Sequence, residues 1–230
     1  MDFAGLVILI TGASKGIGLA LANIMHEYGA TVIGLYNNTK IEDVLFETYK
    51  CDLCNEEDIK NLIKYVKNKH EKIDVLVNCA ALSIDDDIYE KTKEDFMKVL
   101  EVNLVGTFLM CKYVSLEMDR GVIINVSSTN AQDTYTPISM DYDASKAGVE
   151  NLTKNLALRF SNLKICALAP NWVATESVLS MDKDYLESEL KRVGQSKLLR
   201  KEEVALKIIE IIINDDIRSG EIIRMGGFGE

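Results

Sequence analysis

The fold of this chain is decided by the stretch VILITGASKGIGLALA, residues 7–22. It opens with the apolar run Val7–Ile10, which is rich in β-branched residues and predicts a parallel strand buried on both faces. Gly12, Gly16 and Gly18 then permit a tight turn, the approach of a phosphate and close packing of helix on strand. The helix that follows directs its free N–H groups at this turn, so we expect an anion to bind there.

The spacing of the glycines narrows the choice of ligand. Gly18 is followed by Leu19 and Ala20, whereas the phosphate loop of nucleotide triphosphatases needs Lys and Ser or Thr at these positions. The pattern Gly-x-x-x-Gly-x-Gly instead resembles the short-chain dehydrogenase/reductase family. A turn that serves packing alone is the alternative for the glycines by themselves.

This resemblance implies an α/β fold in one dinucleotide-binding domain over residues 1–230. The expected architecture is a Rossmann-like, doubly wound parallel sheet of about seven strands, with helices on both faces. A chain of 230 residues that is 47% hydrophobic is long enough to bury such a sheet. No second domain is needed.

The charge of the chain limits its partners. A formal net charge of −10 disfavours nucleic acid or an anionic membrane surface as a general partner, although a local basic patch is still allowed. No apolar run reaches the ~18 residues of a membrane span, and the N-terminus enters the first strand without a basic segment, so we expect a soluble, cytoplasmic protein.

The five cysteines suit buried thiols in a reducing compartment better than disulfides. Cys51-x-x-Cys54 has the spacing of a redox or half-zinc motif, but no second cysteine pair accompanies it. We therefore expect no metal site.

The end of the predicted second strand, 31–35, bears on the choice of cofactor. An acidic residue here binds the ribose 2′-hydroxyl in NAD sites, and its charge would repel the 2′-phosphate of NADP. The chain has Tyr36, Asn37 and Asn38 instead, and Lys15 in the glycine turn matches a position where NADPH-preferring relatives often carry a basic residue. The sequence thus favours NADPH over NADH, with a solvated Lys15 as the alternative.

The connection 39–50 is expected to carry a short helix before a third strand that ends near residues 49–53. Asp52, just past that strand, matches the family position that meets the adenine amino group, although an Asp here can also cap a turn. Asn55 is followed by an acidic first turn and helical apolar spacing, which predict a structural helix.

Val75–Val77 predict the next strand, and Asn78-Cys79-Ala80-Ala81 follows where the family usually has Asn-Asn-Ala-Gly. The helix expected over 92–112 places Asn103 in its apolar stripe, where a buried amide needs a specific partner. In the family, an Asn in this helix holds a water next to the catalytic Lys. A bond to a nearby backbone carbonyl at a bend near Gly106 is the alternative.

Residues 121–128 predict a fifth strand that ends in Ser127 and Ser128, and Tyr142 follows fourteen residues after Ser128. Tyr142 and Lys146 are spaced i and i+4, so they share a helix face, and a nearby ammonium lowers a Tyr pKa from its usual value of about 10. The interval from Ser128 to Tyr142 carries one extra residue relative to the family pattern. Ser128 is therefore preferred over Ser127 as the family's serine, but the two stay open.

A sixth strand, 164–168, leads to a loop that resembles the family's Pro-Gly loop around the nicotinamide, with Asn171 in place of Gly. The polar segment of about 177–199 corresponds to the part that closes over substrate in this family. A helix over 202–213 and a strand over 221–225, followed by Gly226 and Gly227, complete the chain.

The resemblance implies a carbonyl reductase. In it, Tyr142 donates a proton to the carbonyl oxygen of the substrate, and Ser128 hydrogen-bonds the same oxygen. Lys146 lowers the Tyr142 pKa and binds the ribose hydroxyls of the cofactor, and Asn103 supports a water that relays protons. The expected substrate is a small molecule or a carbonyl compound linked to acyl-carrier protein, with a 3-oxoacyl thioester first and a sugar, polyol or steroid second. A non-catalytic dinucleotide sensor is the rival from another class. The family habit is a homotetramer. Besides Tyr142 and Lys146, the residues expected to bind the cofactor are Gly12, Ser14, Lys15, Gly16, Ile17, Gly18, Asn37, Asp52, Leu53, Asn78, Ala80, Pro170, Val173 and Thr175.

Overall fold

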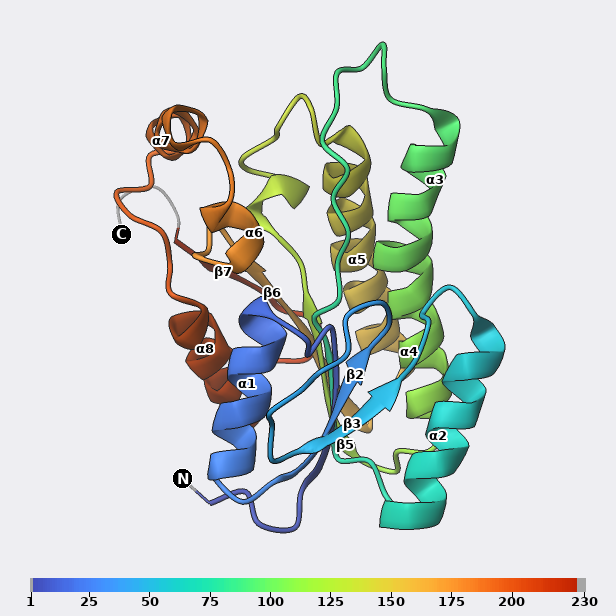
Figure 1. Cartoon of the computed structure of the whole chain (residues 1–230). Helices are drawn as coiled ribbons and strands as arrows, with labels where there is room; N and C mark the ends of the chain where they lie inside the picture. The colour runs from blue at the N-terminus through green and yellow to red at the C-terminus, as the bar shows by residue number, and fades with distance from the viewer. Residues whose placement is uncertain (1, 227–230) are drawn as a thin grey trace.

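A single parallel sheet organises the computed structural model, which describes residues 2–226 (Figure 1). Its seven strands run in the order β3-β2-β1-β4-β5-β6-β7, and every neighbouring pair is parallel. This confirms the predicted fold class. The strands are β1 (Val7–Thr11), β2 (Thr31–Tyr36), β3 (Glu47–Lys50), β4 (Val75–Asn78), β5 (Gly121–Val126), β6 (Leu163–Pro170) and β7 (Ile222–Met225).

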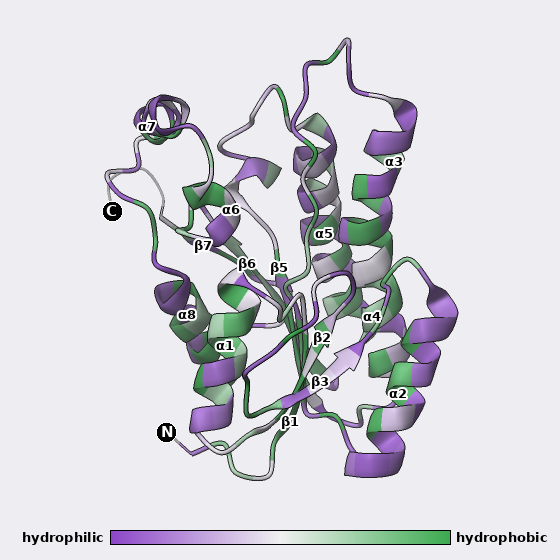
Figure 2. Cartoon of the chain, in the orientation of Figure 1, coloured by the Kyte–Doolittle hydropathy of each residue, from purple (hydrophilic) through white to green (hydrophobic). Residues whose placement is uncertain are grey.

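Helices cover both faces of the sheet and so create two hydrophobic layers (Figure 1). Helices α1 (Gly16–Glu27) and α8 (Lys201–Ile213) pack on one face, and α2 (Glu56–His70), α4 (Gly106–Ser115) and α5 (Met140–Arg159) pack on the other. The central strands are apolar along their length, while the helices turn polar residues outward (Figure 2). Burial of both strand faces explains why the strands read as continuous apolar runs.

The connection between β2 and β3 differs from the sequence prediction, because it contains no helix. Ile41 and Phe46 of this connection are both buried in the layer that contains α1. The ring of Phe46 packs so closely on β2 that a Cβ at Gly34 would lie 2.6 Å from it. The segment therefore gains more from inserting two apolar side chains than from a short helix, whose nucleation is costly.

The helix predicted over 92–112 is broken into three parts. The side chain of Thr92 caps α3 (Lys93–Leu100), a π-helical turn η1 (Glu101–Val105) follows, and α4 then continues the same direction. Asn103 lies inside the π-helical turn and is buried. Single π-helical turns are frequent at functional sites.

The remaining short elements follow the carboxyl ends of the strands, where open parallel sheets bind ligands. The turn η2 (Thr129–Ala131) follows β5, and α6 (Glu176–Leu179) and α7 (Lys183–Arg192) follow β6. Gly227, expected in the C-terminal tail, lies outside the described residues. No helix in the described part of the chain has the length and apolar character needed to cross a membrane.

Candidate active site

The glycine turn after β1 is packed closely on itself and against the segment that follows β4. Gly12 has a φ of +67°, and a Cβ there would lie 2.7 Å from the Cα of Ala80. A Cβ at Gly18 would lie 2.4 Å from the carbonyl oxygen of Gly12. The hydroxyl of Thr11 accepts the N–H groups of Cys79 and Ala80, both at 3.0 Å, and so fixes the segment after β4 beside the turn. Only glycine fits this arrangement.

The N-terminus of α1 holds an anionic oxygen that the protein itself supplies. The Gly16 N–H donates to Oε2 of Glu176 at 2.9 Å, and Lys201 binds Oε1 of the same carboxylate at 2.7 Å. The bond from Lys201 is the main reason that the pKa of Glu176 lies below its usual value. This turn therefore binds negative charge, as its helix dipole predicts. The close approach at the glycines and this anion-accepting amide fit the pyrophosphate of a dinucleotide.

Two of the predicted cofactor residues beside the turn contact α6 rather than the end of β2. Lys15 is exposed, and its ammonium donates to the hydroxyl of Ser177 at 3.3 Å. Thr175 packs over Gly16, where a Cβ would lie 3.2 Å from its methyl group, and its hydroxyl accepts the N–H of Val178 as the cap of α6. Ser14 and Ile17 are half-buried within the turn.

On the adenine side of the expected site, Asn37 and Asp52 lie at the ends of the adjacent strands β2 and β3 and are half-buried. One carboxylate oxygen of Asp52 accepts the N–H of Cys54 at 3.0 Å, which is the turn-capping role that the sequence allowed. Leu53 is buried and packs against Gly106 at the start of α4.

Asn78 points away from the glycine turn. Its side-chain N–H groups donate to Asn125 Oδ1 at 2.9 Å and to the sulfur of Cys111 at 3.3 Å, in the layer beneath β4 and β5. Ala80, two residues later, is the part of this segment that meets the turn. The side chain of Asn78 is thus a structural element of the buried layer.

Of the two serines after β5, Ser128 lies beside Tyr142. The Ser128 side chain lies near the Tyr142 phenol and lowers its pKa. Ser127 is turned the other way, and its hydroxyl donates to the carbonyl of Lys146 at 3.2 Å and to Glu150 at 3.3 Å. Ser128 and Tyr142 are therefore brought together, and Ser127 is engaged with the backbone of α5.

Lys146 is buried, with 2% of its surface exposed. Its ammonium donates to the carbonyl of Val126 at 2.8 Å and lies 5.4 Å from the centroid of the Tyr142 ring. Burial lowers the pKa of Lys146 to about 8, because removing an ammonium from water disfavours its charged form.

The pKa of Tyr142 differs from the sequence prediction in this structure. Burial raises it to about 12, and the carboxylates of Asp143 and Asp85 add to the rise, against the lowering by Ser128. The expectation that Lys146 lowers the Tyr142 pKa is therefore wrong here, because Lys146 is not among the main groups that shift this pKa and burial outweighs the lowering by Ser128. The phenol is protonated at neutral pH.

The Asn103 side chain connects the π-helical turn to the loop after β4 and to α5. Its Oδ1 accepts the Leu82 N–H at 2.7 Å, and its Nδ2 donates to the Leu82 carbonyl at 2.8 Å and to the Ser145 hydroxyl at 3.0 Å. Ser145 precedes Lys146 on α5. Asn103 therefore has the specific partners that its burial demands, and they differ from the local carbonyl at Gly106 that was the alternative.

Sequence reasoning missed the group that holds Ser128 in place. The Asn130 N–H donates to the Ser128 hydroxyl at 3.2 Å, and Nδ2 of Asn130 donates to Asp143 Oδ1 at 2.8 Å. Oδ2 of Asp143 accepts the Thr136 N–H at 2.8 Å. The extra residue between Ser128 and Tyr142 was the signal in the sequence, since a longer loop needs its own anchors.

The segment after β6 contains α7, which carries Tyr185 and Arg192. Burial is the main cause that raises the pKa of Tyr185, and the hydrogen bond to Glu189 is the main cause that raises the pKa of Arg192. The charge of Asp85 adds to the first rise and that of Asp143 to the second, so these carboxylates lie within electrostatic range of α7. Pro170 ends β6, and Val173 is buried and bridges to Leu199. The sequence offered no pattern that selects Tyr185 and Arg192.

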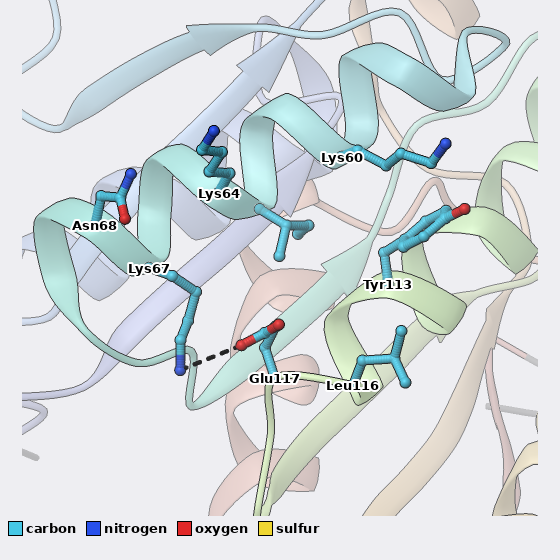
Figure 3. Close-up of a pocket in the computed structure, with 8 residues that line it drawn as sticks. Lys60, Lys64, Lys67, Asn68, Tyr113, Leu116 and Glu117 are labelled. Carbon is cyan, nitrogen blue, oxygen red and sulfur yellow. Dashed lines mark ion pairs between the residues drawn. The ribbon is translucent and has the colours of Figure 1, made fainter.

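The residues described here contain no group of three His, Cys, Asp or Glu side chains arranged to hold a metal. Burial is the main cause that raises the thiol pKa to about 12 at Cys51 and to about 11 at Cys54, and both cysteines are free. A groove between α2 and α4 lies apart from every expected site residue; Figure 3 shows its lining, which includes Lys60, Lys64, Lys67, Tyr113, Leu116 and Glu117.

Comparison with known proteins places this geometry in a family. The model of the short chain dehydrogenase family matches residues 6–186. The 3-oxoacyl-[acyl-carrier-protein] reductase FabG of Thermotoga maritima is 31% identical, with 99% of this chain and 98% of that protein aligned. The 3-hydroxyacyl-CoA dehydrogenase type-2 of Bos taurus is 30% identical over 97% of this chain and 94% of its own length.

Among solved structures, the ligand-free aldohexose dehydrogenase of Thermoplasma acidophilum superposes with a TM-score of 0.88. It is 25% identical, and the match covers 98% of this chain and 94% of that one. With the packed glycine turn and the grouping of Ser128, Tyr142 and Lys146, these matches show that the chain belongs to the short-chain dehydrogenase/reductase family and is an NAD(P)-dependent oxidoreductase acting on CH–OH groups.

Proposed function

We propose that this enzyme reduces a carbonyl compound to an alcohol with NADPH, and that its substrate is a 3-oxoacyl thioester. The observation that carries the proposal is the grouping of three side chains: Ser128 lies near a protonated Tyr142, and the ammonium of Lys146 lies 5.4 Å from the centroid of the Tyr142 ring. Relatives whose names specify 3-oxoacyl-[acyl-carrier-protein] reduction support the choice of substrate. A dinucleotide sensor would need the glycine turn but not these three side chains together.

In this proposal, Tyr142 donates its phenolic proton to the substrate oxygen as the carbonyl carbon is reduced. Bound NADPH supplies the hydride. The Ser128 hydroxyl hydrogen-bonds the same oxygen and keeps it within reach of the phenol, and the ammonium of Lys146 stabilises the phenolate that remains. Asn103 holds the loop after β4 against α5 and supports the water that returns a proton to the site.

The preference for NADPH rests on charge. The end of β2 carries Tyr36 and the neutral Asn37, so no carboxylate there repels a 2′-phosphate. Lys15 is exposed, and its weak 3.3 Å contact with Ser177 leaves its ammonium free to turn toward a phosphate.

A specific observation favours a second substrate class, an aldose or polyol. After burial, the charges of Asp143 and Asp85 contribute to the raised pKa of Tyr142, and Asp86 and Asp87 follow Asp85 in the loop after β4. These carboxylates repel an acidic carrier protein but accept hydrogen bonds from sugar hydroxyls. The similarity to an aldohexose dehydrogenase agrees with this alternative.

We also propose a homotetramer. Val105 in the π-helical turn, Phe108 on α4 and Leu158 on α5 are 44%, 42% and 87% exposed. Apolar side chains of this size gather at interfaces between subunits.

A screen of NADPH oxidation tests the function. Acetoacetyl-coenzyme A, aldoses, quinones and simple ketones are each offered with NADPH and with NADH, and polyols with the oxidised cofactors. Fastest turnover of acetoacetyl-coenzyme A with NADPH supports the first substrate class, and fastest turnover of an aldose or polyol replaces it with the second. Cofactor binding without turnover of any compound would identify the sensor.

A further inference from the structure

A buried ion pair that the proposed chemistry does not use lies directly before Tyr142. Lys91 Nζ is 2.9 Å from Asp141 Oδ2 and 3.1 Å from Oδ1. The two side chains are 9% and 0% exposed. Because both charges lose their hydration on burial, such a pair contributes little to the stability of the folded protein by itself. We therefore looked for another role of this pair in its contacts.

The contacts of this pair join two segments that form the site. Asp141 Oδ1 accepts the N–H of Tyr142 at 2.9 Å, so the carboxylate holds the backbone of the proton donor. Lys91 also donates to the carbonyl of Ile84, in the loop that follows β4. Through Lys91, this loop is bound to the first turn of α5.

Two further contacts join the same segments. The Asp86 N–H donates to the carbonyl of Ile138 at 3.0 Å, and the Ser139 hydroxyl donates to Asp85 at 2.7 Å. Each of these contacts includes an exposed residue, Asp85 or Asp86, whereas the charged side chains of Lys91 and Asp141 are 9% and 0% exposed. The pair therefore carries the strongest link between the loop 82–91 and the start of α5.

We propose that Lys91 and Asp141 are positioning residues that fix Tyr142 relative to the loop 82–91, which follows β4. The inference rests on the proposed role of Tyr142 as proton donor. Asp141 sets the backbone at Tyr142, and Lys91 keeps that carboxylate oriented and draws in the loop at Ile84. Catalysis is sensitive to such placement, since small displacements of a reacting group cost large factors in rate.

The test compares Lys91→Met, Asp141→Asn and the double variant in the full-length protein. Lys91→Met strands a buried carboxylate, so we expect both thermal stability and kcat to fall. The double variant removes that charge, and the amide oxygen that replaces the carboxylate can still accept the Tyr142 N–H. We expect its stability to return close to that of the wild type, while kcat stays at least tenfold lower because the link to Ile84 is gone.

Two readouts separate positioning from a merely structural role. The substrate is the compound that gives the fastest NADPH oxidation in the screen, and the Kd for NADPH is measured by fluorescence. Because the pair lies away from the glycine turn, that Kd should stay within about twofold of the wild type in every variant. Lys67→Met is the matched control, since it breaks an exposed pair with Glu117 at 3.5 Å, drawn in Figure 3, and should leave kcat unchanged.

A kcat that recovers together with stability in the double variant overturns the positioning role. Tyr142→Phe, measured in parallel, distinguishes the two proposals. If that variant loses turnover and the double variant keeps it, only the positioning role fails. If Tyr142→Phe itself keeps turnover, the proposed function fails, and the positioning role fails with it.

Discussion

At the scale of single residues, Tyr142 carries the proposed chemistry. Tyr142→Phe removes the phenolic proton and little of the surface near the cofactor. We expect kcat to fall by at least tenfold, because a positioned general acid contributes typically 10² to 10⁴ in rate, and the Kd for NADPH to stay nearly unchanged. Steady-state kinetics and a fluorescence titration check both. Retention of more than about a tenth of the turnover would remove Tyr142 from the acid role.

Lys15 tests the preference for NADPH. Loss of one charge-assisted contact to the 2′-phosphate in Lys15→Ala should weaken NADPH binding by about tenfold or more and leave NADH binding nearly unchanged. Tyr36→Asp should reverse the preference, because a carboxylate repels the phosphate and accepts the 2′-hydroxyl. Both cofactors are titrated into the wild type and the two variants. Tighter binding of NADH by the wild type, or equal weakening by Lys15→Ala, contradicts the assignment.

The burial of Lys146 affects the free energy of unfolding. Holding a charged Lys146 in the folded protein costs about 3 kcal/mol at neutral pH, since burial lowers its pKa from 10.5 to about 8. Lys146→Met removes that cost and loses one hydrogen bond to Val126, worth about 1 kcal/mol. The variant should therefore be more stable than the wild type by about 2 kcal/mol, although inactive. Urea unfolding without cofactor measures this difference.

The lowered pKa of Lys146 also makes the stability of the folded protein depend on pH. Between pH 8 and 10.5 the unfolded chain binds a proton at Lys146 that the folded protein releases, so stability due to this group rises with pH across that window and is flat below it. The rise should vanish in Lys146→Met. An equal pH dependence in both proteins would assign the slope to other groups.

At the scale of elements, the turn between β1 and α1 is the most constrained junction. Gly12 and Gly5 both have positive φ, at +67° and +84°, but a Cβ meets the Ala80 backbone only at Gly12, and nothing lies within 4 Å of Gly5. Each Ala substitution costs about 1 kcal/mol for the backbone conformation. Gly12→Ala adds a backbone clash, so it should lose more stability and at least tenfold in NADPH affinity. Equal effects at the two sites would refute the close-packing account of Gly12.

The start or end of an element could be predicted from the sequence only where residues within the same turn determine it. The cap at Asn55 was confirmed, because its side chain accepts the Glu57 N–H at 3.0 Å within the same turn. The π-helical turn at Asn103 could not be predicted, since it is bonded to Leu82 and Ser145, which are distant in sequence. The prediction of a helix between β2 and β3 was wrong for the same reason, because that segment is held by the packing of Phe46 on Gly34, which lies on the neighbouring strand β2.

At the scale of the whole molecule, assembly is the property to test. Phe108→Glu places a charge on the apolar face of α4 and should convert a tetramer into smaller species, observed by light scattering after size exclusion. Leu45→Glu is the control, because Leu45 is 88% exposed in the connection between β2 and β3. A wild-type protein that is already a monomer, or equal effects of the two variants, would reject the proposed interface.

The sequence by itself determined the fold and the identity of the central chemical groups. Buried parallel strands leave unbroken apolar runs, and the glycines and the Tyr142–Lys146 spacing are local patterns that do not depend on the tertiary structure. Only the tertiary structure decided how these groups are held. It distinguished Ser128 from Ser127, raised the pKa of Tyr142 to about 12, placed Glu176 on the Gly16 amide, and buried Lys91 beside Asp141. Burial and contacts between segments far apart in the chain set these properties, and neither is written in any local stretch of sequence.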